Sequence, residues 1–118
     1  MKFPVEIWLR GDNHATTQMI APSNANPRTW TDGDVAGVLV AMLRALDRAK
    51  NPAGDEEKPV ALRGFSWIVN PFEDGVVIAL EMSMGAAVAG PFDVPERELT
   101  AAITRVMNAE RATTQTVH

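Results

Sequence analysis

The sequence predicts an α+β fold, with a mostly antiparallel sheet of about four to five strands and two helices packed on one face. Three observations lead to this prediction. Residues 3–10 alternate apolar and polar side chains, which is typical of a strand with one buried face. Residues 31–50 and 93–110 repeat apolar side chains at three- and four-residue steps, as amphipathic helices do. Residues 62–92 carry few charges and are interrupted by turn-forming residues, which favours a meander of strands.

Length and composition indicate one domain. The chain has 118 residues, of which 46% are hydrophobic and 22% charged, enough for one core and too few for two. We expect a single α+β domain over residues 1–110 and a flexible tail over residues 111–118. Cysteine is absent, which excludes disulfides, thiolate metal sites and cysteine nucleophiles.

Charge and hydropathy disfavour two classes of partner. The formal charge of -4 lacks the basic character of a nucleic-acid-binding protein, so no nucleic acid is expected. No membrane association is expected either, because no stretch reaches the roughly 18 uninterrupted apolar residues of a membrane span. Glu6 and Arg10 interrupt the first residues before a secretory signal can form. A cytoplasmic location is the simplest expectation for this acidic, cysteine-free chain.

The N-terminal residues predict a strand followed by a tight turn. Phe3–Leu9 form the strand, with the odd-numbered residues facing the core. Glycine, aspartate and asparagine at 11–13 then favour a turn, and residues 15–21 are expected to return as a second strand. If they do not, residues 11–30 remain one long loop, which is uncommon in a compact domain unless it is functional.

The first helix is predicted to begin with a capping box. Thr31 is placed as the N-cap, Asp34 is the acid three residues later, and Trp30 and Val35 occupy the positions of a hydrophobic staple. The helix should end near residue 51, because Pro52 disfavours helical geometry in the residue before it.

A solvated connector and three strands are expected next. Residues 51–59 hold two prolines, a glycine and several charges, which is typical of a connector. A strand over 60–70 has apolar side chains on both faces, so we predict that it is central in the sheet. Asp74 and Gly75 are expected to supply the positive-φ position of the following turn. Residues 76–83 and 86–92 complete the meander.

The second helix is predicted to open near residues 93–96. Two starts fit the sequence equally well. Either Asp93 is the N-cap with Glu96 three residues later, or Pro95 is the first helical residue.

The period-two pattern also predicts an interaction surface. It puts Trp8, Phe65, Trp67, Val69 and Val77 on the sheet face that the helices leave uncovered. Monomers seldom expose so much contiguous apolar area, and aromatic residues are enriched at the centres of protein interfaces. We therefore expect a binding module that self-associates through this face, most simply as a dimer, with another protein as a further partner. The alternative is that the 11–30 segment or the C-terminal tail folds over the face.

Residues suited to catalysis are few. Neither histidine lies in a framework that would orient it for acid–base work, no serine has the glycine-flanked setting of an activated nucleophile, and no phosphate-binding loop is present. No cofactor and no metal are expected, and the sequence leaves open whether the protein is an enzyme. The second hypothesis is a small-molecule binder or enzyme whose site lies beneath the 11–30 segment, with Asp12, His14 and Arg28 as its polar groups.

Overall fold

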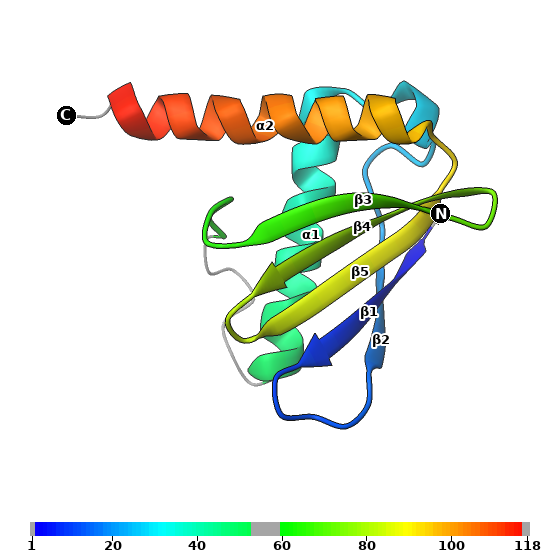
Figure 1. Ribbon diagram of the computed structural model, residues 1–118, viewed down its shortest axis with the longest axis vertical. Helices are drawn as coiled ribbons and strands as arrows, with labels where there is room; N and C mark the ends of the chain where they lie inside the picture. The colour runs from blue at the N-terminus through cyan, green and yellow to red at the C-terminus, as the bar shows by residue number, and fades with distance from the viewer. Residues whose placement is uncertain (1, 53–59, 117–118) are drawn as a thin grey trace.

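Two helices pack on one face of a five-stranded antiparallel sheet, so the predicted α+β fold is confirmed (Figure 1). The computed structural model describes residues 2–52 and 60–116, with side chains described as far as residue 111. The predicted connector therefore lies largely outside the described residues. The elements, in chain order, are β1 Phe3–Leu9, β2 Thr16–Ile20, the short 3-10 helix η1 Pro27–Thr29, α1 Asp32–Lys50, β3 Ser66–Phe72, β4 Gly75–Met82, β5 Gly85–Phe92 and α2 Glu96–Thr116.

The strand order is β2-β1-β5-β4-β3, and every neighbouring pair is antiparallel. The first strand therefore lies between its hairpin partner and the last strand. The prediction that residues 60–70 form a central strand is wrong, because β3 begins at Ser66 and is an edge strand. Both faces of this strand are apolar because Ile68 lies on the face away from the core, where it is 53% exposed.

The core lies between the helices and one face of the sheet. Alternate residues of the three inner strands point into it, and α1 and α2 each add a stripe at helical spacing. Figure 1 shows α1 crossing behind the strands and α2 running beside β3. The most deeply buried residues include Val5, Ile7, Leu39, Met42, Leu46, Ile78, Leu80, Phe92, Leu99 and Ile103.

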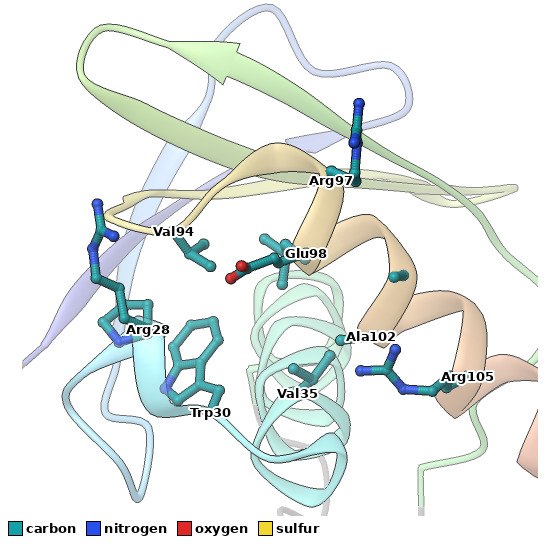
Figure 2. Close-up of a pocket in the computed structure, with 11 residues that line it drawn as sticks. Arg28, Trp30, Val35, Val94, Arg97, Glu98, Ala102 and Arg105 are labelled. Carbon is teal, nitrogen blue, oxygen red and sulfur yellow. The ribbon is translucent and has the colours of Figure 1, made fainter.

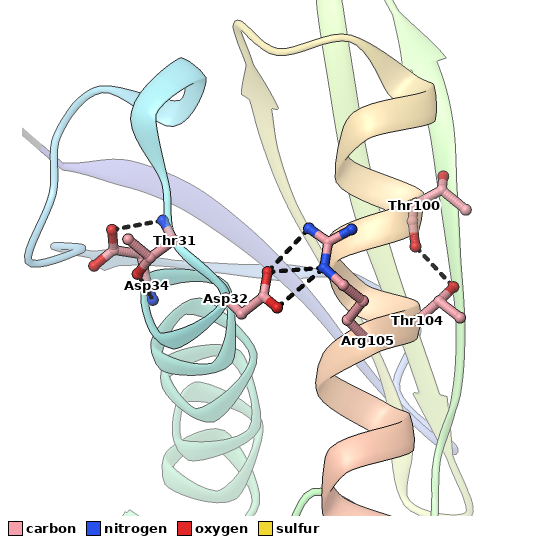
Figure 3. Close-up of polar contacts among 6 residues, drawn as sticks. All are labelled: Thr31, Asp32, Asp34, Thr100, Thr104 and Arg105. Carbon is pink, nitrogen blue, oxygen red and sulfur yellow. Dashed lines mark hydrogen bonds and ion pairs between the residues drawn. The ribbon is translucent and has the colours of Figure 1, made fainter.

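The start of α1 confirms the predicted capping box. The Asp34 amide donates to Thr31 Oγ1 at 3.1 Å, and the Thr31 amide donates to Asp34 Oδ2 at 3.0 Å (Figure 3). These two bonds satisfy amides that have no partner inside the first helical turn. The helix ends at Lys50, with Asn51 as its C-cap, as the following proline predicts.

The second helix differs from its prediction at both ends. It begins at Glu96, and the Leu99 amide donates to the Pro95 carbonyl, so Pro95 precedes the helix. Asp93 does not cap it, because its carboxylate is 3.0 Å from Arg28 Nη2. The helix continues to Thr116, well into the predicted tail 111–118. Once a helix exists, each added residue gains a backbone hydrogen bond, so weak periodicity does not end it.

Two close backbone approaches fix the turns of the meander. The positive φ in the β3–β4 turn belongs to Glu73, at 55°, and the prediction for Asp74-Gly75 is wrong. Gly75 is instead the first residue of β4, where a Cβ would collide with the Phe92 carbonyl. Gly85 opens β5 with a φ of 155°, and a Cβ there would collide with the Trp8 carbonyl. Both glycines therefore permit neighbouring backbones to meet.

Candidate functional site

The sheet has one face that no described helix covers. Because side chains alternate along a strand, the register assigns alternate residues of all five strands to this surface, which we call the open face. Its members are Pro4, Glu6, Trp8, Thr17, Met19, Ser66, Ile68, Asn70, Phe72, Val77, Ala79, Glu81, Ala86 and Val88.

Four large apolar side chains of the open face are about half exposed. The exposed fractions are 47% for Trp8, 49% for Met19, 53% for Ile68 and 50% for Phe72. Small, partly buried apolar residues lie between them. Val88 of β5 is opposite Ala79 of β4, and Ala79 is opposite Ile68 of β3. The middle of the face is therefore flat and apolar, and its acids are Glu6 and Glu81.

Two of the predicted interface residues, Trp67 and Val69, lie on the covered face of β3. Trp67 is paired with Leu80 and Val69 with Ile78, and both partners lie in the core. Val69 is itself only 5% exposed. The assignment is wrong because both faces of this strand are apolar, and a shift of one residue exchanges the faces.

The remaining predicted interface residues divide between the faces. Phe65 precedes β3 and packs against the core. Trp8 and Val77 do lie on the open face, as predicted. Sequence reasoning missed Met19 and Ile68. For Ile68 the sequence offers no signal, because its neighbours Trp67 and Val69 are apolar as well.

A pocket of about 320 Å³ lies between the segment around η1 and the first turns of α2 (Figure 2). Trp30, Val35, Val94, Leu99 and Ala102 form its apolar lining, together with Pro27 and Ala101. The polar lining residues are Arg28, Arg97, Glu98 and Arg105.

Trp30 is held rigidly in the pocket wall. Its indole Nε1 donates to the Asn24 carbonyl at 2.7 Å. Its ring meets Phe92 edge-on, with the centroids 5.1 Å apart. The amide of Asn24 donates in turn to Asp34 Oδ2 at 3.3 Å, which ties this wall to the capping box. The pocket wall is therefore held in place by ring packing and by hydrogen bonds within the chain.

Two ion pairs flank the pocket. Arg28 Nη2 lies 3.0 Å from Asp93 Oδ1, and Arg105 makes a two-pronged contact with Asp32, its Nη2 3.0 Å from Oδ1 (Figure 3). The hydrogen bond from Arg105 lowers the pKa of the Asp32 carboxyl, and the hydrogen bond to Asp93 raises the pKa of Arg28. Each pair joins the α1 or η1 region to the region of α2.

Two charged side chains in the first turn of α2, Arg97 and Glu98, point in different directions. Figure 2 shows the Glu98 carboxylate within the pocket, between Val94 and the Trp30 ring, whereas Arg97 points away from it. The polar character inside the pocket therefore comes from Glu98, with the guanidinium groups at its sides.

The three polar residues predicted for a ligand site do not converge. Asp12 follows the end of β1, where its amide donates to the Leu9 carbonyl. His14 lies in the same turn. Arg28 pairs with Asp93, beyond the other end of β5 (Figure 1). The pocket does lie beneath part of the 11–30 segment, but only residues 27, 28 and 30 of that segment line it.

The described ranges contain neither a cluster of metal-ligating side chains nor a membrane-spanning helix. Within residues 2–52 and 60–116, no three acidic or histidine side chains lie close enough together to bind a metal ion. Over the same ranges, neither helix has the length and apolar character needed to cross a bilayer.

The chain was also compared with known proteins. No family model matches it, and neither the curated proteins nor the solved structures give a match.

Proposed function

We propose that this protein is a binding module, and that its open face docks on the same face of a second copy. One observation carries the proposal: Trp8, Met19, Ile68 and Phe72 are each about half exposed around a centre of small apolar residues. Large exposed apolar patches on a soluble domain mark interaction sites. A reducing, cytoplasmic setting suits a chain without cysteine.

A second copy suits this surface for a geometric reason. Two sheets stack face to face at about 10 Å when their facing side chains interdigitate. Small residues such as Ala79, Ala86 and Val88 leave room for the larger Trp8 and Ile68 of a copy. An isologous contact of this kind is the most common way in which soluble proteins form oligomers.

Light scattering on purified protein tests the proposal. Trp8→Glu and Ile68→Glu should each stay folded and lose the open-face contact, so the mass seen by light scattering should fall below that of the unchanged protein, because a carboxylate in a desolvated apolar patch loses its hydration without gaining a partner. Asn108→Glu, on an exposed position of α2, adds the same charge outside the face and should leave the dimer intact. A wild-type protein that remains monomeric at every concentration would refute the proposal.

The pocket supports a second candidate function, the binding of a small molecule. Its rigid apolar wall and single inward carboxylate suit a ligand with an apolar body and a hydrogen-bond donor, which would contact Trp30 and Glu98. Ligand sites combine apolar groups with polar groups that fix the orientation of the ligand, and this pocket has both kinds.

Native mass spectrometry of the purified protein tests this second candidate. Glu98→Gln and Arg28→Ala should alter the retained small molecules, because both side chains line the pocket. His14→Ala is the matched control, since His14 lies at the other end of the sheet. Identical ligand profiles for all four proteins would exclude this function.

A further inference from the structure

The sheet has two edges, β2 and β3, and the register shows which backbone groups each edge directs away from the sheet. The Arg10 amide donates to the Met84 carbonyl at 2.9 Å, which continues the β1–β5 ladder by one residue. Hydrogen-bonded pairs alternate with non-bonded pairs in an antiparallel ladder. The even-numbered residues of β1 therefore bond to β5, and the odd-numbered residues bond to β2.

The same alternation extends to both edges. In β2, Thr16, Gln18 and Ile20 bond to β1, so Thr17 and Met19 direct their amides and carbonyls outward. In β3, the even-numbered residues bond to β4, so residues 67, 69 and 71 direct their backbone outward.

The two edges differ in their capacity to accept another strand. The outward position 71 of β3 is a proline, which has no amide hydrogen to offer. Proline at such a position is a common way to block pairing at a sheet edge. The edge of β2 has no such block, since Thr17 and Met19 both keep their amides. β2 also contains no charged residue, and charge is the other common block.

The side chains around β2 leave this edge open. Arg48 Nε donates to Gln18 Oε1 at 3.1 Å, and the side-chain nitrogen Nε2 of Gln18 donates to the Ala45 carbonyl at 2.9 Å. Both contacts hold Gln18 against α1, on the covered face. In the part of the chain that the structure describes, no recorded hydrogen bond uses the outward groups of Thr17 or Met19.

We infer that β2 is a pairing edge, and that it pairs antiparallel with β2 of a second copy about a two-fold axis at Gln18. In this register Thr17 of each copy is opposite Met19 of the other, so every outward amide meets an outward carbonyl. Thr16 is opposite Ile20 on the covered face, and the strand itself contains no charged residue that could oppose its counterpart. The strand is thus complementary to itself, which favours a second copy over an unrelated chain.

This contact goes beyond the proposed function because it uses backbone groups and not the open face. It would join two five-stranded sheets into one continuous sheet. Thr17 and Met19 of both copies would then lie together on the open side, next to Glu6 and Pro4 of β1.

Amide hydrogen exchange measured by NMR tests the inference directly. As the protein concentration rises from micromolar to about 1 mM, the amides of Thr17 and Met19 should become protected. The amides of Gln18 and Ile20 bond to β1 within one chain, so they are the internal reference and should be protected throughout. Free exchange of Thr17 and Met19 at every concentration would overturn the inference.

Paired variants give a second, independent test. Thr17→Pro removes one outward amide and should abolish the concentration-dependent protection of Met19 and lower the mass seen by light scattering. Thr17→Ala keeps the amide and should behave as the unchanged protein. Equal association of the proline and alanine variants would overturn the edge contact.

The two proposed contacts are separated by the same measurements. Trp8→Glu should leave the protection of Thr17 and Met19 unchanged, because Trp8 lies on β1 and does not touch the outward backbone of β2. If Trp8→Glu also leaves the mass unchanged while Thr17→Pro lowers it, the edge contact stands and the open-face contact fails. If an added extended peptide protects these amides and a second copy does not, the inferred partner is wrong.

Discussion

At the scale of single residues, Trp67 decides which face of β3 is buried. It packs against the core on the covered face, opposite Leu80. We expect Trp67→Glu to lower the free energy of unfolding by at least about 2 kcal/mol, because a carboxylate there is desolvated without a partner. Urea denaturation measures the loss, which should be the same at all protein concentrations. Trp8→Glu on the open face is the control, and similar midpoints for the two variants would contradict the assignment of faces.

Thr31 is a second residue whose contribution to stability can be measured by substitution. It accepts the Asp34 amide in the capping box. Thr31→Ala should cost about 1 kcal/mol of stability, because that amide then has no protein partner. Thr31→Ser keeps the acceptor and should restore most of the loss. If serine and alanine are equally destabilising, the hydroxyl does not cap the helix.

The carboxylate of Asp34 makes stability depend on pH. The Thr31 backbone amide lowers the pKa of Asp34, with smaller help from Asn24 and Ser23 side chains. A lowered pKa means that the unfolded chain binds a proton more readily than the folded one. The contribution of Asp34 is therefore complete above its ordinary pKa of about 3.9 and is lost as the pH falls below that value. Thermal melts of Asp34→Asn should show a shallower decline below about pH 4 than the unchanged protein, and parallel declines would contradict this.

At the scale of elements, the buried rows of β4 and α1 carry the core. Leu80 is 1% exposed and Leu43 is 6% exposed. Truncating either to alanine should cost about 2–5 kcal/mol, through lost burial and the cavity left behind. Val77→Ala, on the open face of β4, should cost much less. Urea midpoints measure the difference, and a loss below about 1 kcal/mol for Leu80 would contradict the row assignment.

The sequence pattern placed correctly those elements that have one clearly apolar and one clearly polar face. β1 alternates apolar and polar residues without a break, and α1 has a capping box and a proline stop, so both were placed correctly. β3 was misplaced because Trp67, Ile68 and Val69 are all apolar, and only the register with β4 tells which of them faces the core. The extent of α2 was underestimated because helix propagation needs no apolar stripe in its last turns.

At the scale of the whole molecule, the two candidate sites depend on contacts between distant segments. The pocket forms where η1 meets the first turns of α2, and the pairs Arg28–Asp93 and Arg105–Asp32 join residues far apart in the chain. No local sequence pattern indicates that these distant segments come into contact. Asp12 and His14 were grouped with Arg28 because they share a segment, but that segment extends along the whole length of the sheet.

The position of β1 between β2 and β5 has a consequence for how quickly the chain folds. The pairs β1–β2, β3–β4 and β4–β5 are hairpins between consecutive strands, whereas Leu9 is opposite Gly85. Closing so long a loop costs entropy before its contacts form, and chains rich in distant contacts fold slowly. We therefore expect the hairpins to form early and the docking of β1 on β5 to set the rate. Until that step is complete, both β1 and β5 expose an unpaired edge, so refolding at high concentration is when the chain is most prone to aggregate.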